Sequence, residues 1–91
     1  MITKELIYEV IDFCNTFINI KNIGYKFTYI GSEDIIILDF KIWSFDEYGF
    51  ISKTIVNLQK RIHNEDDFIE IKKDIIKNYE EQLPKLLEQL K

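Results

Sequence analysis

The segment from Ile35 to Phe45 constrains the fold of this chain more than any other. It has the length of a strand, and its apolar residues fall on both of the faces that a strand presents. One face carries Ile36, Leu38, Phe40 and Ile42, and the other carries Ile35, Ile37, Trp43 and Phe45. A strand with one solvent-exposed face should alternate apolar and polar residues. We therefore expect its second face to be covered by the C-terminal helix, a second copy of the chain or a partner.

Two further strands are predicted on either side of this segment. Tyr25–Ile30 is rich in β-favouring residues and alternates, and Gly31–Asp34 connects it to the central strand. Asp46–Gly49 forms the next turn, with glycine where a left-handed residue is commonly needed. A third strand runs from Phe50 to about Val56. Residues 54–63 fit both a helix and a continuing strand. We favour a long strand, and a short helix at its end stays open.

A helix is predicted at each end of the chain. Thr3 is a suitable N-cap for a helix at Thr3–Ile18, and Asn64 is one for the C-terminal helix. Pro84 predicts a break near Gln82–Leu83, with a short last helix beyond it. The first buried stripe consists of Leu6, Ile7, Val10, Ile11, Cys14, Phe17 and Ile18, with Phe13 off the stripe and free to touch a second surface. The second stripe consists of Phe68, Ile71, Ile75, Ile76, Tyr79 and Leu83.

The order of these elements predicts one α+β domain over residues 1–91. A three-stranded antiparallel meander carries an N-terminal helix and one or two C-terminal helices (αβββα or αβββαα). At 91 residues the chain has room for a single core, and 46% of its residues are hydrophobic, too many for a disordered chain.

Charge and cysteine content narrow the functional classes. The net charge is −4, and Arg61 is the only arginine, whereas nucleic-acid readers concentrate positive charge and use arginine. Direct nucleic-acid binding is therefore not expected.

Cys14 is the only cysteine, so no intramolecular disulfide forms. The N-terminal residues lack a signal-peptide pattern, no apolar run spans a membrane, and the Ile- and Lys-rich, Ala-free composition suggests an AT-rich gene. We expect the cytoplasm of a bacterial host cell.

The sequence offers no catalytic or metal-binding constellation. His63 is the only histidine, and an exposed loop position is favoured over a general base because no nucleophile pairs with it. Glu65, Asp66 and Asp67 fit the acidic first turn of a helix without a metal. We therefore expect no enzymatic activity, no metal and no cofactor.

Tyr25, Tyr29, Trp43 and Tyr48 are the most suggestive aromatic residues. Aromatic side chains on an open sheet stack nucleobases, and they also anchor protein interfaces. A third interpretation, that several of them belong to the core, stays open beside these two.

The chain resembles two groups of small proteins in its order of elements. With Lys72, Lys73 and Lys77 on its last helix, it resembles a double-stranded-RNA-binding domain, in which lysines at this place contact the phosphates of the RNA. The acidic residues Glu70 and Asp74 lie among these lysines and reduce the positive charge of the patch. With its helix at Thr3–Ile18 and its hairpins at Gly31–Asp34 and Asp46–Gly49, it resembles small phage-encoded anti-CRISPR inhibitors. The acids behind this second resemblance are Asp46, Glu47, Glu65, Asp66 and Asp67.

The second resemblance implies an inhibitor of a bacterial defence effector such as a CRISPR-Cas nuclease, with acids that stand in for phosphates in a basic groove. The expected partner is a protein or ribonucleoprotein, and a homodimer through the sheet stays open. A toxin-neutralising immunity protein and a small RNA-binding domain are the alternatives. The predicted partner-binding residues are Tyr25, Tyr29, Trp43, Asp46, Glu47, Tyr48, Glu65, Asp66 and Asp67.

Overall fold

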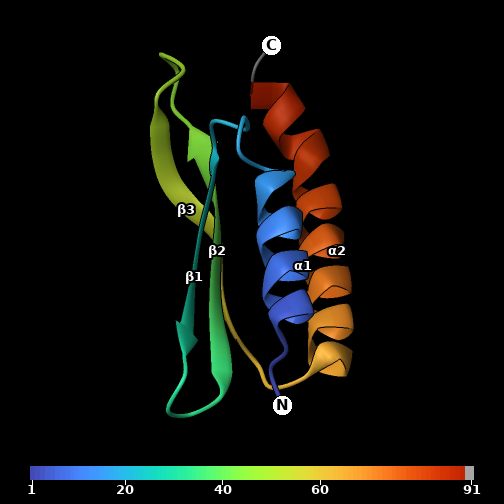
Figure 1. Ribbon diagram of the computed structural model, residues 1–91. Helices are drawn as coiled ribbons and strands as arrows, with labels where there is room; N and C mark the ends of the chain where they lie inside the picture. The colour runs from blue at the N-terminus through green and yellow to red at the C-terminus, as the bar shows by residue number, and fades with distance from the viewer. Residues whose placement is uncertain (90–91) are drawn as a thin grey trace.

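The protein folds as a helix, three strands and a second helix in a computed structural model that describes the backbone of residues 1–89 and the side chains of residues 1–82 (Figure 1). The elements are α1 (Lys4–Asn15), β1 (Ile23–Ile30), β2 (Ile35–Phe45), β3 (Ile51–Ile62) and α2 (Glu65–Gln89). The predicted α+β class, with its αβββα order, is confirmed.

The sheet is an antiparallel meander in the order β1-β2-β3. Its register pairs Phe27 with Leu38 across β1 and β2, and Leu38 with Lys60 across β2 and β3. β3 stays extended up to Ile62, so the predicted long strand is confirmed and the short helix at its end does not form. Pairing with β2 along this whole length supplies the backbone partners that a helix would otherwise provide.

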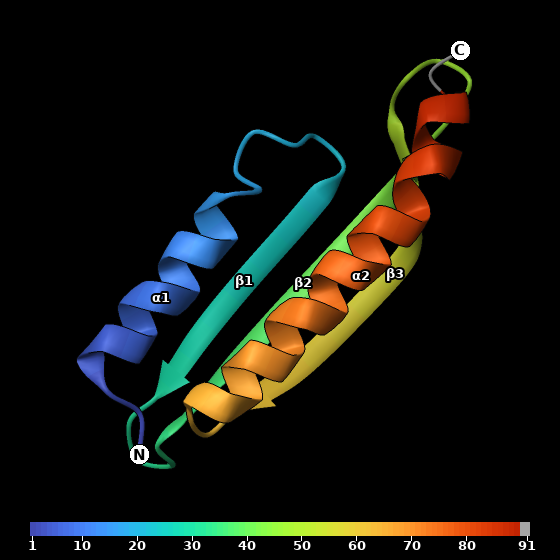
Figure 2. The ribbon, with the colours of Figure 1, turned by 90° about the vertical axis from the view of Figure 1, so that its right-hand side faces the viewer.

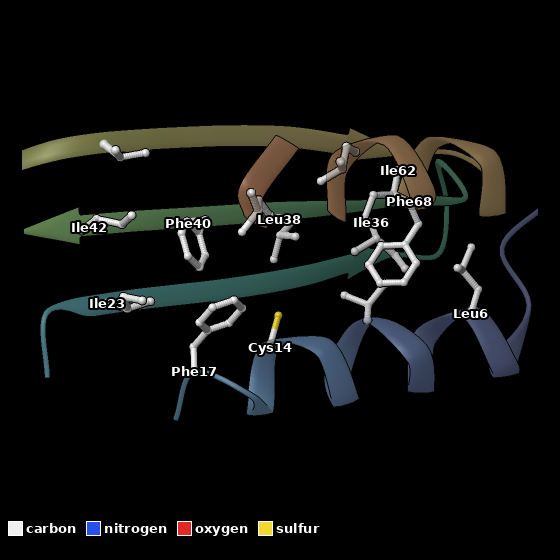
Figure 3. Close-up of a cluster of buried hydrophobic side chains, with 14 of the residues drawn as sticks. Leu6, Cys14, Phe17, Ile23, Ile36, Leu38, Phe40, Ile42, Ile62 and Phe68 are labelled. Atoms are coloured by element: carbon white, nitrogen blue, oxygen red, sulfur yellow. The ribbon is translucent and has the colours of Figure 1, made fainter. Parts of the chain in front are cut away.

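Both helices cover the same face of the sheet (Figures 1 and 2). The core between the two layers contains Leu38, Phe40 and Phe68, each 1% exposed (Figure 3). α2 therefore does not cover the second face of β2, which was one of three expectations for that face. A helix that follows an antiparallel meander can pack only on one side, and α2 shares the apolar side with α1.

α1 is shorter than predicted. Thr3 caps it, because its Oγ1 accepts a hydrogen bond from the Leu6 amide at 3.1 Å. The helix ends at Asn15, and the chain then turns, so Ile18 is 65% exposed instead of lying in the buried stripe. Phe13 touches a second surface as predicted, since its ring lies 5.9 Å from that of Phe68 in α2.

α2 is one helix through Pro84, so the predicted break near Gln82–Leu83 is wrong. A proline removes a single backbone donor, and the helix continues past Pro84 to Gln89. Ile76 is 40% exposed rather than part of the buried stripe, because it lies about 100° around the helix from fully buried Ile75. The predicted stripe residue Leu83 lies outside the side chains that are described.

Candidate functional site

The face of the sheet turned away from the helices is called the open face below. It is formed by alternate residues of β1 (Gly24, Lys26, Thr28 and Ile30), of β2 (Ile35, Ile37, Asp39, Lys41, Trp43 and Phe45) and of β3 (Thr54, Asn57, Gln59 and Arg61). No part of residues 1–89 packs over it as a second layer (Figure 1). Although β2 is apolar on both faces, only its helix-side residues belong to the main core cluster.

The four predicted aromatic residues do not lie together. Tyr25 and Tyr29 pair with Phe40 and Ile36, so they share the helix side of the sheet. Tyr25 is half-buried, and its hydroxyl lies 3.4 Å from the side-chain oxygen of Asn15 in α1. Only Trp43 belongs to the open face. A platform of several aromatic rings for nucleobases is therefore not assembled on the open face.

Trp43 lies across the start of β1. Its ring occupies the space that a Cβ at Gly24 would take, since that Cβ would lie 2.2 Å from the Cη2 atom of the indole. Asn22 holds the Trp43 backbone from both sides: its carbonyl accepts from the Trp43 amide at 2.8 Å, and its side-chain amide donates to the Trp43 carbonyl at 3.0 Å. Buried Asn22 thus fixes the position of the indole on the open face.

A shallow hollow of about 410 Å³ lies beside the indole. Gly24, Tyr25, Lys26, Asp39, Lys41 and Trp43 line it. Asp39 accepts a hydrogen bond from the side chain of Gln59 at 2.9 Å, on the β3 side. No described acidic group lies within ion-pair distance of Lys26 or Lys41. The hollow therefore combines one aromatic wall with two ammonium groups and the carboxylate of Asp39, which is the cross-strand neighbour of Lys26 but forms no ion pair with it.

The connection from β2 to β3 (residues 46–50) together with Ile51, the first residue of β3, is called the hairpin tip, and it lies beyond the point where β1 begins (Figure 2). Asp46 shapes it, because its Oδ1 accepts hydrogen bonds of 2.9 Å from the Tyr48 and Phe50 amides. Gly49 has φ of +83°, the left-handed conformation predicted for it. Tyr48 and Phe50 are 77% and 70% exposed. The hairpin tip therefore presents two aromatic side chains and the exposed Glu47.

The predicted acids at the start of α2 lie at the opposite end of the molecule from the hairpin tip (Figure 1). Asp67 accepts a 2.9 Å hydrogen bond from the His63 amide and lies 3.2 Å from its Nδ1, which together hold the pKa of this carboxyl below its usual value. Asn64 caps the helix by accepting from the Asp67 amide at 2.9 Å. Glu65 and Asp66 are exposed in the first turn. The predicted binding residues therefore form two separate groups.

The lysines of α2 are partly engaged within the chain. The Nζ of Lys72 lies 5.1 Å from the ring centre of Phe68, which places it over the aromatic face. Asp74 binds Lys60 of β3 at 3.5 Å, and the Asn78 side chain donates to the backbone carbonyl oxygen of Asp74 at 2.8 Å. Lys73 and Lys77 remain as the exposed lysines of the predicted patch.

Groups with reactive potential are isolated from one another. Cys14 is buried under the sheet, and burial raises the pKa of its thiol to about 11, so it is protonated at neutral pH. Among residues 1–89, no three His, Cys, Asp or Glu side chains come together in a way that could hold a metal ion. Within the same range, no helix combines the length and the apolar character that a membrane crossing requires.

Sequence reasoning missed two parts of this surface. Phe50 and Ile51 were assigned only to a strand, because an apolar pair after a turn is typical of a strand start and carries no signal that both side chains are exposed. Lys26 and Lys41 were not singled out, because only the register of β1 against β2 brings them to one hollow.

Comparison of the chain with protein-family models, with curated proteins and with solved structures gave no significant match.

Proposed function

We propose that this chain is a binding protein that blocks or regulates another macromolecule through its hairpin tip and the adjoining open face. The observation that carries the proposal is the exposed apolar surface of the tip, where Tyr48, Phe50 and Ile51 are 77%, 70% and 49% exposed. Exposed apolar clusters of this kind mark interaction sites in small proteins, and aromatic residues contribute most of the binding energy of many interfaces.

A bacterial defence effector such as a CRISPR-Cas nuclease is the target class that we propose, from the small acidic chain and its order of elements. The mode of binding that we favour is apolar contact rather than phosphate mimicry. Asp46 and Asp67 use their carboxylates in a turn and a helix cap. Of the remaining acids, Glu47 belongs to the hairpin tip, whereas Glu65 and Asp66 belong to the opposite end of the molecule. A continuous acidic strip would be needed to imitate a nucleic-acid backbone.

Binding of RNA through α2 is not favoured. Lys72 lies over Phe68, and the acidic Glu70 and Asp74 interrupt the lysines of this helix. The aromatic residues are likewise divided between the two faces of the sheet. α2 therefore offers lysines without a stacking platform, and the open face offers a single ring, Trp43, rather than the row of rings on which single-stranded RNA stacks.

The test compares three tagged proteins in pull-downs from nuclease-treated lysate of a bacterium that carries CRISPR-Cas and other defence systems. Tyr48→Ala removes the aromatic anchor at the hairpin tip. Tyr8→Ala is the matched control, because Tyr8 is also an exposed tyrosine, 55% exposed, but belongs to α1. We expect wild type and Tyr8→Ala to capture the same effector and Tyr48→Ala to lose most of it. The captured effector is then purified, and its cleavage activity is measured with and without the chain.

A second variant separates the two modes of binding. Charge reversal of the helix-start acids by Glu65→Lys with Asp66→Lys should leave capture unchanged if the apolar tip is the anchor. Loss of capture in this variant, with retention in Tyr48→Ala, would contradict the apolar mode. Failure of wild type to retain any protein after nuclease treatment would contradict the proposed function itself, and capture of a toxin would replace the target class.

A further inference from the structure

The three strands carry a charge opposite to that of the chain. They contain five basic residues (Lys26, Lys41, Lys53, Lys60 and Arg61) and a single acidic one, Asp39. The strands therefore have a net charge of +4 within a chain of −4. The acids that make the whole chain negative belong to the helices, loops and turns. The net charge of the chain is therefore opposite in sign to the charge of its sheet.

The positive charge of the open face is concentrated beside Trp43. Lys26 and Lys41 line the same hollow as the indole, and Arg61 lies further along the same face, opposite Ile37. Asp39 is turned to Gln59, which leaves both lysines of the hollow without an ion pair among the described residues. At physiological salt the screening length is about 8 Å, so the field over the hollow is set mainly by the charges of the open face rather than by the acids of the helix layer. Asp39, opposite Lys26, offsets one of these charges, and Lys26, Lys41 and Arg61 together leave the open face positive.

We propose that this hollow binds an acidic segment of a protein partner, with a carboxylate between Lys26 and Lys41 and an apolar side chain against the indole of Trp43. The inference rests on the proposed function and adds the chemistry of the partner to it. Charge complementarity selects an acidic occupant. A protein segment is favoured over RNA because the indole of Trp43 is held against Gly24 on one side and offers a single stacking position. The tyrosines of the sheet, Tyr25 and Tyr29, lie on its helix side.

The position of the hollow also suits a segment that continues to the hairpin tip. Phe45 follows Trp43 on the same face of β2, and its cross-strand partner Ile51 belongs to the hairpin tip. A partner seated on Tyr48 and Phe50 would therefore meet Trp43 next and the lysines after it. Apolar anchoring at one end and charge pairing at the other fix the direction of the bound segment.

Trp43 is the only tryptophan of the chain, so its fluorescence reports directly on the hollow. The probe is a short synthetic peptide of alternating Glu and Thr around one central Leu. The same peptide with Lys in place of every Glu, and a single-stranded oligouridylate, are titrated in parallel. We expect saturable change of the Trp43 emission with the Glu peptide alone, weakening as salt is raised.

Charge variants then assign the effect to the lysines. K26E/K41E should weaken binding of the Glu peptide about tenfold, since two weak attractions become two weak repulsions. K26Q/K41Q places no new acid beside Asp39 and should weaken binding of the Glu peptide by a smaller factor. It keeps the test valid if K26E/K41E does not fold. K73E/K77E is the matched control, with the same charge change on exposed lysines of α2, and should bind like wild type.

Each contrary result has a definite meaning. Emission that ignores the Glu peptide, or equal affinity in wild type and both Lys26/Lys41 variants, would overturn the acidic-segment proposal. Tighter binding of oligouridylate than of the Glu peptide would replace it with a nucleic-acid site. The two proposals fail separately: an effector captured equally by wild type and K26Q/K41Q, yet lost in Tyr48→Ala, leaves the proposed function standing and removes only the acidic segment.

Discussion

Gly24→Ala is expected to destabilise this protein, although the same change is usually favourable in a strand. Gly24 has no left-handed backbone angle, so alanine alone would gain about 0.5–1 kcal/mol from its smaller conformational entropy. The added Cβ would, however, lie 2.2 Å from Cη2 and 2.7 Å from Cζ3 of Trp43. Contacts this short force the indole to leave its place across β1.

The expected magnitude follows from the surface that the indole uncovers. Large aromatic side chains bury about 150–250 Å² each, and exposing about 80 Å² of this costs about 2 kcal/mol at 25 cal/mol per Å². After the conformational gain from alanine is subtracted, the net loss of unfolding free energy is about 1–1.5 kcal/mol, or about 5–10 °C in Tm for a domain of this size.

The assay is urea and thermal unfolding followed by Trp43 fluorescence, which also reports the red shift expected when the indole moves into water. Gly31→Ala is the matched control: its new Cβ would lie 3.7 Å from Tyr29, an ordinary contact, and its stability should change by less than about 0.5 kcal/mol. Unchanged or increased stability in Gly24→Ala, together with an unshifted emission spectrum, would refute the packing of Trp43 on β1.

Three further changes test the core, the helix cap and the buried thiol. Phe40→Ala should cost about 3–5 kcal/mol in urea unfolding, because Phe40 is 1% exposed and its ring lies 5.2 Å from that of Phe17, and a cost below about 1 kcal/mol would contradict this burial. Asp67 has a pKa lowered by the His63 amide, so its stabilising contribution is present above the ordinary carboxyl pKa and is lost as pH falls through its folded value. Asp67→Asn should therefore be less stable than wild type at pH 7, and the two stabilities should converge in acid, whereas a gap independent of pH would argue against the assignment. Cys14, with its thiol pKa raised to about 11, should react with Ellman's reagent only as the chain unfolds, so rapid modification of the native protein would show that the thiol is accessible.

The surface that we propose for binding differs in character from the chain as a whole. The protein is acidic, but its exposed sheet is basic and apolar, and its acids serve helix starts and turns at several positions. A target chosen from net charge alone would be a basic groove. A target chosen from the open face would present carboxylates and apolar side chains, and the two choices are separated by the lysine and helix-start variants above.

The nature of each element could be predicted from the sequence because it depends on neighbours along the chain. The bounds of β2 from Ile35 to Phe45 were predicted correctly, since its long apolar run is bordered by turn residues on both sides. Thr3 as a cap and Gly49 as a left-handed turn residue follow from local backbone chemistry, and both are confirmed. Ile18 and Ile76 were misplaced because periodicity identifies a helical face but not where a helix ends or how wide its covered stripe is.

The αβββα order, the antiparallel connections and most of the core follow from the amino-acid sequence, because short loops and apolar periodicity leave few alternatives. The open face of the sheet, the packing of Trp43 on Gly24 and the placement of Lys26 and Lys41 in one hollow emerge only in the folded chain. These features depend on strand register and on the side of the sheet to which both helices return. Both are settled by packing between residues far apart in the chain, and no local pattern encodes them.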